Sequence, residues 1–219
     1  MLRCLLVLVI LSPWLVLEAR AGAWPREKGQ GFLSVSGQID QPDDFGFYNH
    51  FIGLYAEYGA TDRLTLGLDL GGDTLRMTKG IAFARWPLGQ LERPLKLAVE
   101  IGLGQVDGQN ALRPGLSVGQ GFTIWDRHGW AAVDGRLVLF KSGGHTLESD
   151  MTIGLSTSRR SKTILQIQTG RPAHGRPYTR LAPSFVYRMR PGAYLEFGLI
   201  APLSGSGKRG LKLGIWRKF

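Results

Sequence analysis

Charged side chains recur at alternating positions along this sequence, between apolar or small neighbours. Glu57, Asp69 and Lys212 each stand in such a context. Successive side chains of a β-strand point to opposite faces of a sheet, so the alternation predicts one apolar face and one charged face. Twelve charged positions fall on the charged face, seven of them basic and five acidic. These candidate lumen-lining residues are Glu57, Arg63, Asp69, Lys96, Glu100, Arg113, Asp134, Arg136, Arg180, Arg188, Glu196 and Lys212.

Two interpretations of these charges stay open. If they surround water, the lumen is mildly basic and draws in anionic or aromatic-carboxylate solutes by focusing the electric field. If they pair across neighbouring strands, they fill a narrow interior, as happens in small barrels. Barrels of about eight strands are filled and barrels of about sixteen strands hold an open channel, so an intermediate strand number does not decide between the two.

Histidine and serine offer the other candidate chemistry. His50, His145 and His174 fall at or beside predicted external turns, and Ser142 and Ser149 lie close to His145 in the sequence. A nucleophilic site needs a base within hydrogen-bond reach of the hydroxyl and a third group that orients the base. The spacing of these residues does not predict such a site, so we expect no catalytic residue and no enzyme.

Metal, cofactor and nucleic-acid sites are not expected either. The four histidines are scattered, and the one cysteine, Cys4, lies near the start of the chain. This composition gives no support to a structural zinc site. The glycine-rich turns do not follow the GxxxxGK[ST] pattern of a phosphate-binding loop. No motif of a DNA- or RNA-binding fold accompanies the net charge of +10.

Strict alternation of apolar residues, rather than helical spacing, recurs after residue 22. In the fourth of the strands that it predicts, Ile81 and Phe83 indicate one parity and Trp86 the other, which leaves room for a β-bulge. The predicted strands lie near residues 30–40, 52–58, 64–70, 79–87, 95–103, 112–122, 129–140, 151–155, 165–167, 181–187, 195–199 and 211–219.

Twelve strands is an even number, which places both ends of the chain on the same side of a membrane. If the first strand runs outward, this side is the periplasm. The opposite turns, rich in Gly, Pro, Asp and Asn, are then external, and none is long enough to fold into a plug. Aromatic residues near strand ends are expected to form a girdle at the membrane interface. The girdle candidates are Tyr58, Trp86, Trp125, Trp130, Tyr187 and Trp216.

The start of the chain has the pattern of a secretory signal peptide. Arg3 is followed by an apolar run from Cys4 to Leu17 and by the small-x-small sequence Ala19-Arg20-Ala21. The run is shorter than the roughly 20 residues that a membrane-spanning helix needs. We therefore predict a cleaved signal peptide over residues 1–21 and one barrel domain over residues 22–219. The domain stays strongly basic, which fits anionic lipopolysaccharide or a cation-lined lumen.

Three segments carry a resemblance to known proteins: GAWPREKGQG (22–31), LYAEYGATDRLTLGLDL (54–70) and the close GLKLGIWRKF. They resemble uncharacterised proteobacterial outer-membrane proteins, similar to the transporters associated with phenol degradation. The resemblance implies that Phe219 is the signal read by the outer-membrane assembly machinery, although Arg217 is atypical for that signal. The outer-membrane phospholipases, which use a His-Ser-Asn site on the barrel wall, are similar in size and strand number.

Together, these observations predict an all-β fold, a single antiparallel transmembrane β-barrel of about twelve strands in the outer membrane of a Gram-negative cell. The expected function is a passive or facilitated channel for small solutes. A lipid-modifying barrel enzyme and a closed structural barrel are the alternatives. The expected partners are outer-membrane lipid and lipopolysaccharide, the assembly machinery and the solutes, with no nucleic acid. The sequence does not predict an oligomeric state.

Overall fold

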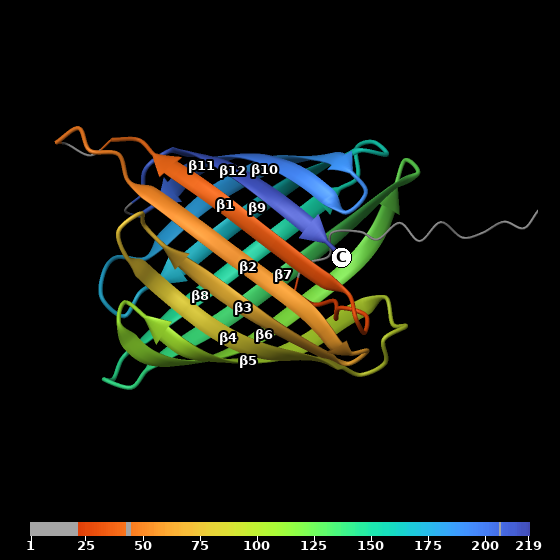
Figure 1. The fold of residues 1–219 in the computed structure, drawn as a ribbon, viewed down its shortest axis with the longest axis horizontal. Coiled ribbons are helices and arrows are strands. Elements are labelled where there is room, and N and C mark those ends of the chain that lie inside the picture. Colours follow the sequence, from red (N-terminus) through yellow and green to blue (C-terminus); the bar gives the residue numbers. More distant parts are fainter. Residues whose placement is uncertain (1–21, 43–44, 206) are drawn as a thin grey trace, which may run out of the picture.

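A computed structural model describes residues 22–42, 45–205 and 207–219. The predicted signal peptide, residues 1–21, lies outside the described residues. The rest of the chain forms one closed barrel of twelve tilted strands (Figure 1). The strands are β1 (Gly31–Asp40), β2 (His50–Thr61), β3 (Leu64–Gly72), β4 (Met77–Leu88), β5 (Leu95–Val106), β6 (Gln109–Ile124), β7 (Arg127–Phe140), β8 (His145–Leu155), β9 (Ser161–Arg171), β10 (Tyr178–Arg190), β11 (Ala193–Ser204) and β12 (Gly210–Lys218).

Each strand pairs antiparallel with its neighbours in sequence, and β1 pairs with β12 to close the barrel. Phe219 extends this last pairing by one residue. Its amide N donates to Gly31 O at 3.1 Å, and its carbonyl O accepts from Gly31 N at 2.6 Å. Closure leaves no unpaired sheet edge. The predicted all-β antiparallel barrel of twelve strands is therefore confirmed.

The outer surface of the barrel is apolar, as the alternation predicts. On β12, Leu211, Leu213 and Ile215 face outward and are 64%, 56% and 56% exposed. Lys212, between the first two, points inward and pairs with Glu196 of β11. An outward apolar band with polar residues inside is the pattern of a transmembrane barrel.

Strand β4 has one parity throughout its pairing with β5, which runs without interruption from Lys79 to Leu88. Ile81 and Phe83 are buried in the interior and Trp86 faces outward. The mixed signal in the sequence arises because this strand places apolar side chains inside the barrel. A register shift does occur, but earlier, where Met77 pairs with the end of β3.

The predicted aromatic girdle is partly wrong. Tyr58, Trp86 and Tyr187 lie on the outer face, and Trp125 is exposed in the β6–β7 turn. Two of the six residues instead point into the lumen. They are Trp130 and Trp216, which are 2% and 8% exposed. Their position on the strand places them on the inward face, where they pack against other buried aromatic residues.

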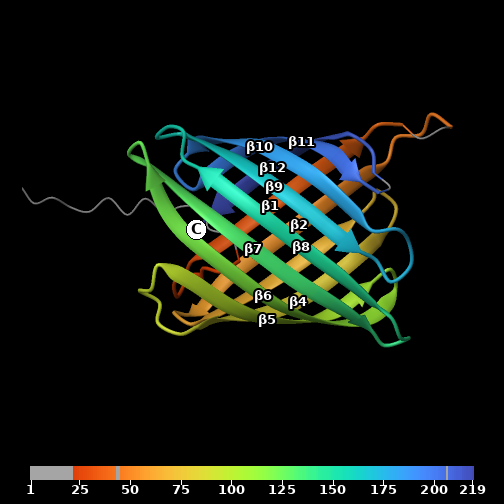
Figure 2. The same ribbon diagram turned by 180° about the vertical axis from the view of Figure 1, so that it is seen from behind.

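We name the two ends of the barrel after the sequence prediction. The periplasmic end carries Phe219 and the segment that leads into β1. The external end carries the β1–β2 turn, which extends beyond the rim (Figures 1 and 2). In the parts of the chain that the structure describes, no helix has the length and apolar character needed to cross a membrane.

Candidate functional site in the barrel lumen

Buried charges fill the interior beside strands β2 to β6. Arg85 of β4 donates to Glu57 of β2 at 2.5 Å and to Glu100 of β5 at 2.7 Å. Tyr55 also donates its hydroxyl to Glu57, at 2.6 Å. The guanidinium of Arg85 lies 5.0 Å from the ring centre of Phe83, a cation–π contact. Each acid is therefore compensated by a donor within hydrogen-bond distance.

The same pattern of alternating charge continues toward the external end. Arg113 of β6 donates to Glu100 at 2.9 Å and to Asp69 of β3 at 2.6 Å. Asp69 also pairs with Lys79 at 2.7 Å. We call this set the charge ladder, and it consists of Arg26, Glu57, Arg85, Glu100, Arg113, Asp69 and Lys79.

A small apolar cluster lies at the external end of the same wall. Its buried members are Ile81, Ala111 and Val138, with Val106 and Phe140 packed against them. Together with the charge ladder, this cluster leaves the half of the interior beside β2 to β6 densely packed. We call it the packed half.

The other half of the lumen, beside β1 and β7 to β12, is hollow, and Arg26, Tyr55 and Glu57 lie at its boundary with the packed half. It holds a cavity of about 380 Å³, which we call the inner cavity. Short or neutral polar side chains cover much of its wall, and Arg136 and Asp150 pair within it at 3.0 Å. The neutral polar residues are Ser34, Ser36, Gln38, Thr152, Gln166, Gln168 and Ser184.

A second cavity, of about 290 Å³, lies at the external end, and we call it the outer cavity. It is lined by residues from the ends of β1, β10 and β11 and from the β11–β12 turn. Gln38, Arg180 and Ile200 line both cavities. The two cavities therefore follow one another along the same side of the barrel.

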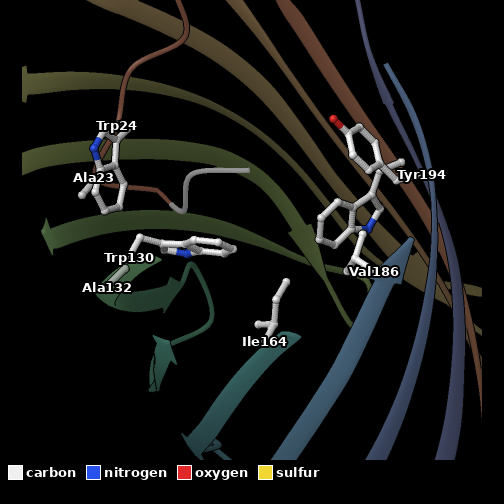
Figure 3. Close-up of a cluster of buried hydrophobic side chains, with 8 residues drawn as sticks. Ala23, Trp24, Trp130, Ala132, Ile164, Val186 and Tyr194 are labelled. Atoms are coloured by element: carbon white, nitrogen blue, oxygen red, sulfur yellow. The ribbon is translucent and has the colours of Figure 1, made fainter. Parts of the chain in front are cut away.

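Aromatic and aliphatic side chains form the periplasmic floor of the inner cavity. Figure 3 shows Ala23 and Trp24 beside Trp130, with Val186 and Tyr194 on the opposite side of the lumen. Tyr194 and Trp216 place their ring centres 6.4 Å apart. The complete cluster is Ala23, Trp24, Trp130, Ala132, Ile164, Val186, Tyr194 and Trp216, with Phe32 packed against it.

Ala23 and Trp24 belong to residues 22–30, an irregular segment that precedes β1 and whose first residues lie inside the barrel. We call it the N-terminal segment. Trp24 packs on Gly119 of β6, where an added Cβ would lie 2.5 Å from the indole. A glycine is therefore required at residue 119 if the indole is to approach the strand this closely.

Further along, the N-terminal segment binds the opposite wall. Arg26 pairs with Glu57 at 2.6 Å, and its amide N donates to the hydroxyl of buried Thr65 at 2.9 Å. The Gly29 amide donates to Gly59 O at 2.8 Å. Since Gly22 lies against Asp134 of β7, the segment crosses the lumen from β7 to β2.

The structure divides the twelve predicted lumen residues into three groups. Glu57, Asp134, Arg136, Arg180, Glu196 and Lys212 line the inner cavity. Asp69, Glu100 and Arg113 lie in the charge ladder of the packed half, and Glu57 belongs to both of these groups. Arg63, Lys96 and Arg188 lie near periplasmic turns, where Arg63 donates to Gly89 O at 2.9 Å and Lys96 donates to Leu91 O. Their roles in permeation remain predictions.

Several interior charges were missed by the sequence prediction. Arg85 and Lys79 are on β4, where the sequence does not predict which side chains point inward because Ile81 and Phe83 indicate one parity and Trp86 the other. Arg26 precedes the first strand, so no alternation marks it. Asp150 does alternate with Thr152 on β8, and the same parity could have found it.

His50, His145 and His174 lie at the external end, as predicted, with His50 and His145 exposed at the starts of β2 and β8. Within residues 22–42, 45–205 and 207–219, no hydrogen bond joins Ser142 or Ser149 to a histidine. The Ser142 hydroxyl instead donates to Gln109. The catalytic alternative gains no support from this geometry, and the absence of enzymatic activity stays a prediction.

No protein-family model matches this sequence, and no curated protein matches it significantly. The fold does match solved structures. The KdgM porin, also solved in complex with disordered oligogalacturonate, aligns with a TM-score of 0.64 at 10% identity over 86% of this chain and 99% of the porin. An outer membrane channel from Pseudomonas putida F1 aligns with a TM-score of 0.57 at 11% identity over 91% and 99%.

At these identities the likeness concerns the fold alone. The barrel shares its overall architecture with these two solved proteins. The finer resemblance to the family associated with phenol degradation stays a prediction.

Proposed function

We propose that this chain is an outer-membrane channel for small solutes. The observation that carries the proposal is the hollow half of the lumen, a cavity of about 380 Å³ continued by one of about 290 Å³ toward the external end. A purely structural barrel of this size has no need for an interior that is packed on one side and hollow on the other. The fold likeness to porins supports the same proposal.

The proposed path is eccentric. A solute enters the outer cavity, passes Arg180 and reaches the inner cavity along the wall of β1 and β7 to β12. Hydroxyl and amide groups on this wall can replace water around a polar solute. The floor formed by the aromatic cluster and the N-terminal segment then limits passage, so we expect small conductance in the full chain.

Solute flux is the direct test. Purified protein is inserted in liposomes, and swelling in solutions of small sugars and carboxylates is compared with swelling of protein-free liposomes. A variant lacking residues 22–24 is measured in parallel, because it removes Trp24 from the floor. Swelling or ion conductance in either protein supports the channel. If neither protein passes any solute, the closed structural barrel replaces this proposal.

The proposed location has its own test. An inserted barrel migrates faster on an unheated denaturing gel than after boiling, and it fractionates with the outer membrane. We infer that Phe219 acts as the assembly signal, so replacing it with Ala should reduce the folded fraction in cells. Unchanged assembly of that variant would remove this role from Phe219 but would leave the channel proposal intact.

A further inference from the structure

The outer cavity contains two cations that form no ion pair within the described part of the chain. Arg180 of β10 and Lys208 of the β11–β12 turn both line it. Arg180 donates through Nε to Gln168 Oε1 at 2.5 Å, and its guanidinium lies 5.6 Å from the ring centre of Tyr178. Neither contact neutralises its charge. Elsewhere in the lumen, Arg85, Arg113, Arg136 and Lys212 all pair with acids, so Arg180 and Lys208 differ from them.

The ammonium group of Lys208 is the less satisfied of the two. Its Nζ is shielded from solvent and has no hydrogen-bond partner among the described residues. An ammonium carries three N–H donors. Shielding a charge without a partner is strongly unfavourable, so an anion bound beside this ammonium would stabilise it.

Backbone contacts hold Lys208 in place on two sides. The Gln41 amide of the β1–β2 turn donates to Arg209 O at 2.7 Å. On the other side, Gly205 packs so closely on Pro177 that an added Cβ would lie 2.1 Å from the proline carbonyl O. These contacts hold the backbone on either side of Lys208, and a restrained backbone lowers the entropy cost of binding a ligand.

One acid, Asp40, also lines the outer cavity. Its Oδ1 accepts a hydrogen bond from the side-chain amide (Nε2) of Gln38 at 2.6 Å and packs against Gly210. The lining therefore carries two positive charges against one negative charge. This excess favours an anion at the external mouth.

We propose that the outer cavity is an anion-binding subsite, in which a carboxylate or phosphate group of an incoming solute binds Lys208 Nζ and the guanidinium of Arg180. The proposal deepens the proposed channel function and rests on it for its biological role. Because Arg180 lines both cavities, it can pass the anion to the inner cavity, where Arg136 and Lys212 lie. The subsite thus selects solutes by charge before they reach the narrow floor.

Equilibrium binding tests the subsite without requiring transport. Inorganic phosphate, and separately benzoate, is titrated by calorimetry into the full barrel folded in detergent. The variants Lys208→Gln and Arg180→Gln each remove one charged donor while keeping a polar, uncharged side chain at that position. Loss of a charge-assisted hydrogen bond should weaken binding of either anion by about tenfold.

Arg209→Gln is the matched control, because Arg209 is exposed in the same turn but does not line the outer cavity. It should bind both anions as the unmodified barrel does. Absence of binding to the unmodified barrel, or equal weakening by Arg209→Gln, would overturn the subsite.

Ion selectivity in planar bilayers separates this proposal from the channel itself. Under a KCl gradient, Lys208→Gln should shift the reversal potential toward lower chloride preference, and Arg209→Gln should not. A barrel that binds phosphate through Lys208 but never conducts would contradict the channel and support the subsite. A conducting barrel in which Lys208→Gln changes neither binding nor selectivity would contradict the subsite alone.

Discussion

The interior charges of this barrel fall into two kinds of environment. In the charge ladder the guanidinium groups of Arg85 and Arg113 each lie between two carboxylates, as Arg113 does between Asp69 and Glu100. Such charges are already neutralised and held by several hydrogen bonds, so they stabilise the packed half. Their electric field acts only weakly on a solute. Arg180 and Lys208 have no acidic partner among the described residues, so their field is available to a solute.

Arg85 gives the clearest test of the charge ladder. Replacing Arg85 with Met leaves Glu57 and Glu100 buried with weaker compensation. We expect the free energy of unfolding to fall by about 3–5 kcal/mol, the range found when one partner of a buried ion pair is removed. Urea titration of the folded barrel, followed by tryptophan fluorescence, measures this change.

The control for this prediction is Arg159→Met, since Arg159 is exposed in the β8–β9 turn and contributes to no interior contact. Its effect should stay within about 0.5 kcal/mol. A loss of less than about 1 kcal/mol for Arg85→Met would contradict the structural role of the ladder, because exposed ion pairs contribute that little.

The sequence predicts which face of the sheet these side chains are on, but it does not predict which residues they contact. Alternation puts Glu57, Glu100 and Arg113 on one face, and all three side chains are buried in the structure. The bond from Arg113 to Asp69, however, joins residues 44 positions apart on β6 and β3, which are not neighbouring strands. Such contacts depend on the tilt and stagger of all strands together, which a single sequence does not specify.

At the scale of elements, the strands were predictable and the N-terminal segment was not. A period of two marks every strand because one face meets lipid and the other meets the lumen. Strand β4 obscured the pattern by placing Ile81 and Phe83 inside. The N-terminal segment has no periodicity, and it folds only because Trp24 and Arg26 find partners on strands far along the chain.

The N-terminal segment should restrict the channel. Deleting residues 22–24 removes Trp24 from the floor but keeps Arg26 and its pair with Glu57, so the barrel wall should remain intact. The deleted residues lie in the lumen, where they fill the space beside β6 and β7. We therefore expect higher single-channel conductance in planar bilayers.

A tryptophan outside the lumen supplies the comparison. Trp125 is 84% exposed in the β6–β7 turn, so Trp125→Ala should conduct as the full chain does. If the deletion leaves conductance unchanged while the barrel still shows heat-modifiable migration, the segment does not restrict flow.

At the scale of the whole molecule, the division of the lumen decides how large the channel is. Twelve strands alone left open whether the interior was filled or hydrated. The structure contains both conditions side by side. The charge ladder and the apolar cluster fill the wall of β2 to β6, and the inner cavity lies beside β1 and β7 to β12. The part of the lumen that a solute can enter is therefore narrower than the barrel itself.

Cysteine accessibility tests this asymmetry. The one native cysteine, Cys4, falls in the predicted signal peptide, so an introduced thiol is the only one in the processed chain. Ser184 lines the inner cavity, whereas Ile81 is fully buried in the packed half. Ser184→Cys should react with a charged methanethiosulfonate reagent and lose conductance, because the added group occupies the solute path.

Ile81→Cys should not react under the same conditions, although its thiol also points inward. Leu213→Cys, on the outer face, should likewise leave conductance unchanged, since its side chain meets lipid. Equal reaction at residues 81 and 184 would mean that water reaches both walls. In that case the ion pairs of the charge ladder would separate in the membrane, and its charges would line a central pore. Charges on every wall of the lumen, rather than on one wall, would then determine which solutes pass.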